Sequence, residues 1–164
     1  MKMANVLDVA QYVYDYYLEM AKEKIDELKL HKLLYFCQRE KLALMNETLF
    51  DEPMEGWIHG PVSVETRNHF NKDKGIDLST APLSEEDKYI IRNVLIQYGD
   101  IASWQLRNMS HKEISWKNSR KGLRSDERGD KELSIEDIRK DAEKVRPYDS
   151  LWDMYYDEFD DIGD

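Results

Sequence analysis

Apolar residues recur at helical spacing in the first segment of the chain. They fall on one helix face: Val6, Val9, Ala10, Val13 and Tyr17. Asn5 stands directly before this stripe, and an asparagine side chain at such a position can accept a hydrogen bond from a backbone N–H of the first turn. The pattern predicts a helix from about Val6 to Lys22.

A second apolar stripe follows Asp26, which is a further capping candidate. The residues expected on its buried face are Leu30, Leu33, Leu34, Cys37 and Leu44. The charged residues between them are expected to face water: Lys29, Lys32, Arg39 and Glu40. This helix should end near Asn46.

Helical spacing stops between residues 48 and 62. Short apolar stretches are interrupted there by prolines and glycines, namely Pro53, Gly56, Gly60 and Pro61. Such punctuation is typical of a small β-hairpin or another extended element. A short helix to about Asn71 is expected after Pro61, because proline is tolerated near the start of a helix.

Two consecutive helices are predicted between Ser84 and residue 110. Ser84 precedes several acidic residues and an apolar stripe that ends at Gly99, which is the pattern of a capped helix. Asp100 is expected to cap the next helix, with Trp104 available to the core.

Residues 110–131 are rich in charge and contain two glycines. The basic residues are Lys117, Arg120, Lys121, Arg124 and Arg128. Acidic residues interrupt them, so the stretch is expected to be a mobile, solvated connection, with contact to RNA or to an acidic partner as the alternative. Ser134 is then expected to start a last helix, from Ile135 to about Val145, which Pro147 ends.

Together these elements predict a mainly α fold. The expected organisation is a compact multi-helix domain, residues 1–147, with a small β-hairpin or extended element near residues 48–62, followed by a tail, residues 148–164. Of 164 residues, 41% are hydrophobic and 35% are charged, and no long apolar run occurs, which excludes a fully disordered chain and a membrane span. The N-terminus lacks the pattern of a secretory signal, and a single cysteine cannot form an internal disulfide. We therefore expect a soluble, cytoplasmic protein.

Negative charge is concentrated at the C-terminus. The chain has a net charge of −10, and residues 148–164 carry seven acidic residues and no basic one. Because a DNA-binding protein needs a basic face, direct nucleic-acid binding is not expected. A helical tail would align the apolar residues Tyr148, Leu151, Trp152, Tyr155, Phe159 and Ile162. This stripe indicates either a helix docked on the domain itself or an element that lies in a cationic groove of a partner.

No residue pattern indicates catalysis or a bound cofactor. The chain has four histidines: His31, His59, His69 and His111. They show no paired ligand spacing, and Cys37 lies in the buried stripe of its helix, which favours an inert thiol. A glycine-rich phosphate loop and a Gly-x-Ser-x-Gly motif are both missing. We expect no catalytic residue, no metal and no cofactor.

Several short motifs occur in a fixed order along the chain. They are Asn5-Val6-Leu7-Asp8-Val9-Ala10, Lys29-Leu30-His31-Lys32-Leu33-Leu34-Tyr35, Leu49-Phe50-Asp51-Glu52, Gly60-Pro61-Val62, and the set Tyr98-Gly99-Asp100, Leu106, Ser110-His111 and Trp116. In this order they resemble the Panacea family, also called the SocA-like antitoxin domain, over roughly residues 5–120. His31 stands where the family usually has glutamine, and Ser110 stands where it usually has threonine.

The resemblance implies the antitoxin of a toxin–antitoxin system, a protein that neutralises a cognate protein toxin by direct binding. One alternative is a proteolytic adaptor that delivers the toxin to a AAA+ protease. A second is a prophage or mobile-element protein that inhibits a host protein. The third is an enzyme of unrecognised chemistry, for which no motif gives positive support.

Toxin-binding residues are expected at two places. The first is the segment around the Gly-Pro pair, with Trp57, His59 and Pro61, where the alternative is a purely structural corner. The second is the tail, with Trp152, Tyr155 and Phe159.

Overall fold

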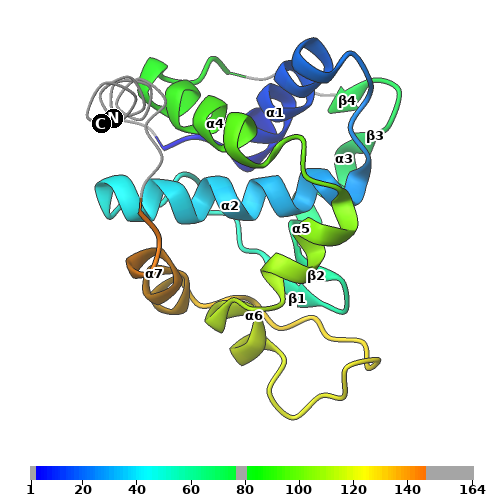
Figure 1. Cartoon of the computed structure of the whole chain (residues 1–164), viewed down its shortest axis with the longest axis vertical. Helices are drawn as coiled ribbons and strands as arrows, with labels where there is room; N and C mark the ends of the chain where they lie inside the picture. Colours follow the sequence, from blue (N-terminus) through cyan, green and yellow to red (C-terminus); the bar gives the residue numbers. More distant parts are fainter. Residues whose placement is uncertain (1–2, 77–80, 147–164) are drawn as a thin grey trace, which may run out of the picture.

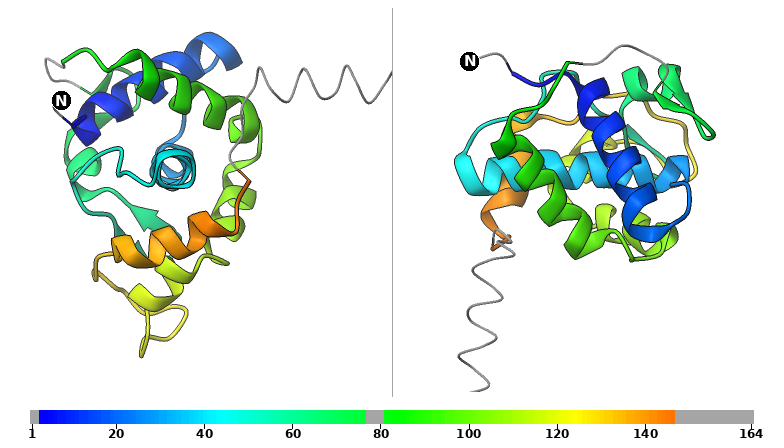
Figure 2. Two further views of the ribbon diagram at one scale, coloured as in Figure 1. Left: turned by 90° about the vertical axis from the view of Figure 1, so that its left-hand side faces the viewer. Right: turned by 90° about the horizontal axis from the view of Figure 1, so that it is seen from above.

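One long helix, α2 (Glu27–Met45), runs through the middle of the structure, and the other elements surround it (Figure 1 and Figure 2). The computed structural model describes residues 3–76 and 81–146. Within these ranges the remaining elements, in chain order, are α1 (Val6–Ala21), β1 (Glu55–Trp57), β2 (Gly60–Val62), α3 (Val64–His69), β3 (Phe70–Asn71), β4 (Gly75–Ile76), α4 (Glu85–Tyr98), α5 (Ser103–Ser110), α6 (Ile114–Ser119) and α7 (Ile135–Glu143). Both described sheets are two-stranded, so the predicted mainly α class is confirmed.

Four of the helix starts carry the caps that the sequence predicts. The side chains of Asn5, Asp26, Ser84 and Ser134 accept hydrogen bonds from the backbone N–H groups of Leu7, Lys29, Asp87 and Asp137, respectively. Each bond satisfies a donor that has no partner within its helix. The first two helices end at Lys22 and Asn46, whose φ angles of 60° and 56° are left-handed and stop helical hydrogen bonding.

The prediction that one side of α2 faces solvent is wrong. Its charged residues Lys29, Lys32, Arg39 and Glu40 are all buried. The reason is that α1, α4, α5, α7 and the β1–β2 hairpin pack around α2 on several sides, so the helix has no free face over most of its length. Leu44, which was expected in the core, is 45% exposed because it lies in the last turn of α2.

Buried charges on α2 are bonded to the elements that cover it. Lys29 Nζ donates to the carbonyl oxygen of Gly99 (2.8 Å), which follows α4. Lys41 Nζ lies 2.6 Å from Asp87 Oδ1, in the first turn of α4. A buried charge is tolerated only when such partners are present, so these bonds explain how a charged helix can occupy the centre of the fold.

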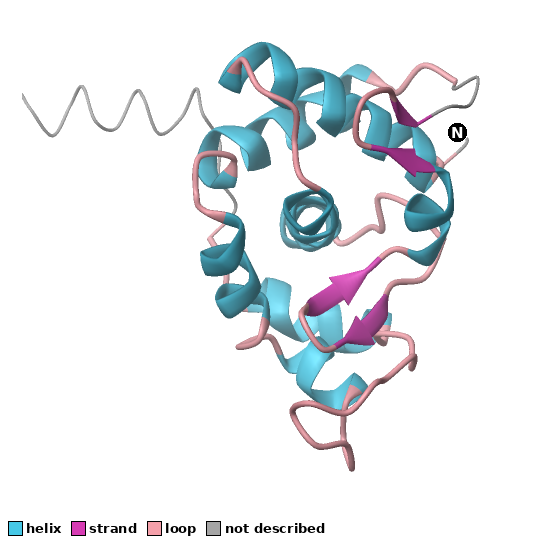
Figure 3. Cartoon of the chain, turned by 90° about the vertical axis from the view of Figure 1, so that its right-hand side faces the viewer, coloured by secondary structure: helices cyan, strands magenta, loops and turns pink. Residues whose placement is uncertain are grey.

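The predicted β-hairpin is confirmed. Strands β1 and β2 pair antiparallel, with Glu55 opposite Val62, Gly56 opposite Pro61 and Trp57 opposite Gly60. The hairpin lies beside α2, as Figure 3 shows in a view along that helix. The short helix expected after Pro61 is α3.

Two predictions in the segment after Gly99 are wrong. Asp100 does not cap the next helix; α5 begins after Ala102, whose side chain makes no capping bond. Trp104 is 61% exposed, because the helix turns its Leu106 face toward the core and Trp104 lies on the opposite side.

Part of the predicted mobile connection is a helix. Residues Ile114–Ser119 form α6, which packs against α7. Arg120, directly after α6, is buried, whereas Lys117, Lys121, Arg124 and Arg128 are exposed, as expected for a solvated stretch.

The tail, residues 148–164, lies outside the described residues. None of the helices in residues 3–76 and 81–146 has the length and hydrophobicity that a membrane crossing needs.

Candidate partner-binding groove

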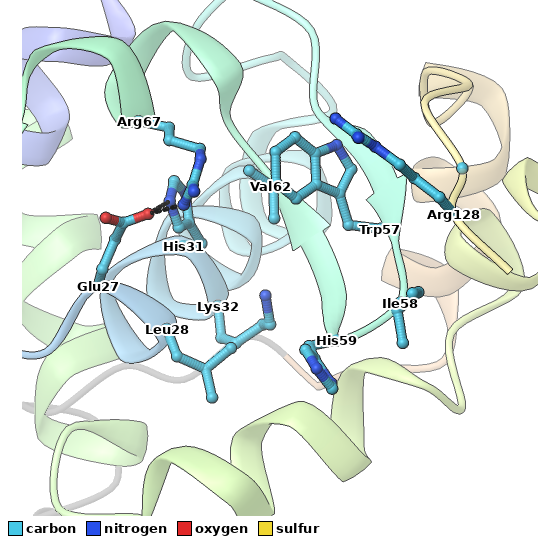
Figure 4. A pocket seen from close by; sticks show the side chains of 11 residues that line it. Glu27, Leu28, His31, Lys32, Trp57, Ile58, His59, Val62, Arg67 and Arg128 are labelled. Atoms are coloured by element: carbon cyan, nitrogen blue, oxygen red, sulfur yellow. Dashed lines mark hydrogen bonds and ion pairs between the residues drawn. The ribbon is translucent and has the colours of Figure 1, made fainter. Parts of the chain in front are cut away.

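A cavity of about 550 Å³ lies between the first turns of α2, the β1–β2 hairpin, α3 and the loop at Arg128 (Figure 4). We call it the hairpin groove. Its lining residues are Glu27, Leu28, His31, Lys32, Trp57, Ile58, His59, Val62, Arg67, Arg128 and Gly129. Two of the residues that the sequence nominates for toxin binding, Trp57 and His59, therefore line the same cavity.

The shape of the hairpin depends on Gly60. Its φ of +111° belongs to a region that side-chain-bearing residues rarely adopt. A Cβ at this position would lie 2.5 Å from Ser110 Oγ and 2.6 Å from Lys32 Cε, so α2 and α5 approach the hairpin backbone closely here. Pro61, the next residue, is buried, so a partner would not contact it directly. Its effect on binding would come from the hairpin shape that it helps to set.

Lys32 lies beneath this turn. Its side chain is fully buried, and Nζ donates to the carbonyl oxygen of Pro61 (2.8 Å). Burial, with a smaller contribution from the positive charge of Arg107, lowers the pKa of Lys32 to about 7. An ammonium group has three donors, so a single acceptor leaves this charge poorly compensated under the groove.

A chain of polar contacts fixes the wall formed by α2 and α3. The Ser63 backbone N–H donates to His31 Nδ1 (3.2 Å), so His31 carries its proton on Nε2 and donates to Glu27 Oε2 (3.2 Å). Arg67 Nη1 donates to the same Glu27 oxygen (2.6 Å). Burial lowers the pKa of His31, which keeps the ring neutral, and the bond from His31 lowers the pKa of Glu27.

Neither residue of this Glu–His pair bonds to a serine, threonine or cysteine side chain in the lining of the groove. The lining residues include no serine, threonine or cysteine. Ser63 contributes its backbone N–H, and its hydroxyl bonds to the Thr66 side chain instead. The pair therefore holds the wall in place.

The groove combines an apolar floor with positive charge. Leu28, Trp57, Ile58 and Val62 supply the apolar surface. Among the titratable lining residues, Lys32, Arg67 and Arg128 are cationic and Glu27 is the only acid, although the chain as a whole carries a net charge of −10. Arg67 lies over the Trp57 ring at 5.3 Å, and Figure 4 draws Trp57 between Arg67 and Arg128.

Contacts from α5 and α6 support the far side of the hairpin. Trp116 Nε1 donates to the Trp57 carbonyl oxygen (2.8 Å), and His111 stacks on Trp116 at 3.9 Å. Burial, with a smaller contribution from the positive charge of nearby Arg107, lowers the pKa of His111 to about 4. On the outer side, Arg107 Nε donates to His59 Nδ1 (2.9 Å).

Motifs that are far apart in the sequence therefore meet at this hairpin. The α2 motif contributes His31 and Lys32, the Gly-Pro motif forms strand β2, and the last motif contributes Ser110, His111 and Trp116 behind it. Both departures from the family pattern, His31 and Ser110, contact the hairpin region directly.

The sequence-based predictions did not identify three cations that line the hairpin groove. Lys32 was assigned to a solvated helix face, although its place inside a family motif was a usable signal. Arg128 was assigned to a solvated stretch and Arg67 was not singled out. The remaining nominated residues, Trp152, Tyr155 and Phe159, lie outside the described residues.

The histidines and the cysteine do not form a metal centre in the described parts of the chain. No group of three or more His, Cys, Asp or Glu side chains placed to hold an ion occurs in residues 3–76 and 81–146. Cys37 is fully buried within α2, and burial raises the pKa of its thiol.

Comparison with known proteins gives one match. No curated protein and no solved structure is similar enough to count as a match. The family model described as "Antitoxin SocA-like, Panacea domain" matches residues 30–117, which is more than half of the chain and includes most of α2, the hairpin, α5 and most of α6. The chain therefore belongs to the SocA-like antitoxin family, the Panacea domain family.

Proposed function

We propose that this protein is the antitoxin of a toxin–antitoxin pair and that it neutralises a protein toxin by binding it directly at the hairpin groove. Family membership supports the toxin–antitoxin role. The observation that carries the groove assignment is the half-buried Trp57 in an apolar-floored cavity, with cations around it and the family motifs beneath it.

The residue types in the groove suit a protein interface. Tryptophan and arginine are enriched among the residues that contribute most to binding, because they bury large areas at small entropic cost. A stable complex buries roughly 800 Å² on each partner, so a cavity of this size would hold an anchoring segment while the surrounding surface supplies the rest.

The proposed mechanism requires no chemistry by this chain. A bound toxin is blocked sterically, and the positive groove adds electrostatic attraction to an acidic surface. A toxin that acts inside the cell needs its antitoxin there, so the proposal places the chain in the cytoplasm.

Co-expression with the adjacent small open reading frame tests this function. We expect the neighbour to arrest growth alone, and the full chain to restore growth and to co-purify with it. Trp57→Ala should reduce co-purification by at least roughly tenfold, because it removes the central aromatic of the groove.

Trp104→Ala is the matched control. Trp104 is 61% exposed on α5 and does not line the groove, so this variant should bind like the wild type. A harmless neighbour would contradict the antitoxin role, and equal binding by both variants would contradict the groove assignment. Loss of rescue in a host without AAA+ proteases would favour the adaptor alternative.

A further inference from the structure

We infer that the hairpin groove recognises a segment in which an acidic side chain lies next to an apolar one: the carboxylate pairs with Arg128, and the apolar side chain packs on Trp57 and Val62. This inference deepens the proposed function and takes the toxin as the source of the segment.

Arg128 is the cation of the groove that has no partner among the described residues. Its side chain is exposed and lines the cavity, and within residues 3–76 and 81–146 it forms no hydrogen bond or ion pair. Arg67, the other arginine of the lining, is already paired with Glu27 at 2.6 Å and lies over the Trp57 ring. A guanidinium can bind a carboxylate with two parallel N–H donors, so Arg128 offers the free site for an incoming acid.

Buried contacts hold Arg128 at the edge of the groove. Arg120 Nη1 donates to the carbonyl oxygen of Gly56 in β1 (3.0 Å), and its Nη2 donates to the carbonyl oxygens of Arg124 (3.1 Å) and Glu127. Gly129 packs so closely that a Cβ there would lie 2.8 Å from Arg120 Nη1. The loop is thereby fixed to the hairpin, which reduces the entropy that Arg128 would lose on binding.

The floor beside Arg128 requires an apolar group as well. Trp57 Nε1 already donates to Glu55 Oε1 (2.9 Å), so the ring offers apolar area. Val62 and Leu28 continue this surface. An acidic side chain without an apolar neighbour would leave the apolar floor exposed to water, and the hydrophobic contribution to binding would be lost.

Lys32, whose pKa is about 7, adds positive potential from below in its protonated state. It is fully buried and bonded to the Pro61 carbonyl, so it acts at a distance and not by direct contact. Charge in a poorly solvated position is screened less than charge on the surface, which strengthens its effect on a carboxylate held above it.

These features favour a peptide over a nucleic acid. A nucleic-acid site carries a row of exposed cations along a backbone. Among the described residues, this groove has one unpaired exposed arginine and an apolar floor, in a chain of net charge −10.

A peptide titration tests the inference without any toxin. The full chain, labelled with ¹⁵N, is titrated with acetyl-Glu-Leu-Phe-Glu-amide and with its neutral match, acetyl-Gln-Leu-Phe-Gln-amide, while the indole N–H signal of Trp57 is followed. We expect a saturable shift with the acidic peptide and a shift at least roughly tenfold weaker in affinity with the neutral one. Equal binding of both peptides, or of neither, would overturn the inference. Saturation by an oligouridylate at lower concentration than the acidic peptide would overturn it in favour of nucleic acid.

Paired charge reversals give the second readout. Arg128→Glu should abolish the response to the acidic peptide, whereas Lys121→Glu, in the same exposed loop but outside the lining, should leave it unchanged. The same variants are then compared for toxin binding. If the peptide response is as expected but the product of the adjacent open reading frame is not toxic, only the antitoxin role is contradicted. If Arg128→Glu leaves toxin binding unchanged, only the inference is contradicted.

Discussion

Lys32 occupies a position that a charged side chain normally avoids. It is fully buried between α2, the hairpin and α5, and one carbonyl oxygen accepts a hydrogen bond from it. Its pKa of about 7 lies below the ordinary value of 10.5, so the folded state resists protonation of this amine. A pKa unit corresponds to about 1.4 kcal/mol, which makes the cost to the fold on the order of 4 kcal/mol at neutral pH.

Lys32→Met should stabilise the fold. The substitution removes the buried charge but leaves the Pro61 carbonyl without its donor, which costs about 1–3 kcal/mol, so we expect the free energy of unfolding at pH 7 to rise by about 1–3 kcal/mol. The wild type should gain stability as pH rises from 7 to about 9, because residue 32 binds more protons in the unfolded chain in that window, and the variant should lack this gain. Above pH 9 the raised thiol pKa of Cys37 acts in the opposite direction in both proteins. Urea denaturation measures both effects.

Lys24→Met is the control for this comparison, because the Lys24 side chain is half exposed. It should change stability little at any pH. A less stable Lys32→Met protein would show that the hydrogen bond of the ammonium outweighs its desolvation.

Gly60 shows how a single position sets the geometry of the hairpin. Its backbone is left-handed, and Lys32 and Ser110 fill the space where a side chain would stand. The close packing of the hairpin against α2 and α5 therefore depends on the missing side chain at residue 60.

Comparison of two glycine substitutions separates backbone strain from this close packing. Gly60→Ala should lower the free energy of unfolding by more than about 3 kcal/mol, since it adds a clash to the strain of a positive φ. Gly122 also has a positive φ (84°) but no atom within 4 Å of a built Cβ, so Gly122→Ala should cost only about 1 kcal/mol. Similar losses in chemical denaturation would mean that the hairpin can move away from α2.

The secondary-structure elements were accessible from the sequence where their signals are local. Asn5, Asp26, Ser84 and Ser134 act on N–H groups within three residues, so the helix starts could be located without knowing the fold. The start of α5 was misplaced because no side chain caps it. Helix α6 was missed because it is short and lies in a charge-rich stretch.

At the scale of the whole molecule, several buried titratable groups make stability depend on pH in opposite directions. Burial lowers the pKa of His31 and lowers that of His111 to about 4, so protonation of either ring opposes folding. Burial raises the pKa of Glu113 to about 7, so its ionisation opposes folding as pH rises from 4.5 to 7.

His111→Phe isolates one of these contributions. The aromatic ring can still stack on Trp116, but the group that titrates is gone. Between pH 6.5 and 4 the His111 ring binds more protons in the unfolded chain than in the folded one, so this ring lowers stability as pH falls, and we expect the variant to lack that contribution. The free energy of unfolding is measured against pH for the wild type and for the variant, and the contribution of Glu113 cancels when one curve is subtracted from the other. Two parallel curves would contradict the low pKa of His111.

The sequence by itself determined the features that local rules encode: the capped helices, the Gly-Pro hairpin, the mainly α class and the ordered motifs of the family. Tertiary structure decided which charged residues are buried. Periodicity assumes that a helix has one face toward the core, and α2 violates this because other elements surround it. The hairpin groove was beyond sequence reasoning for the same reason, since Lys32, Trp57, Arg67 and Arg128 become neighbours only when segments far apart in the chain pack together.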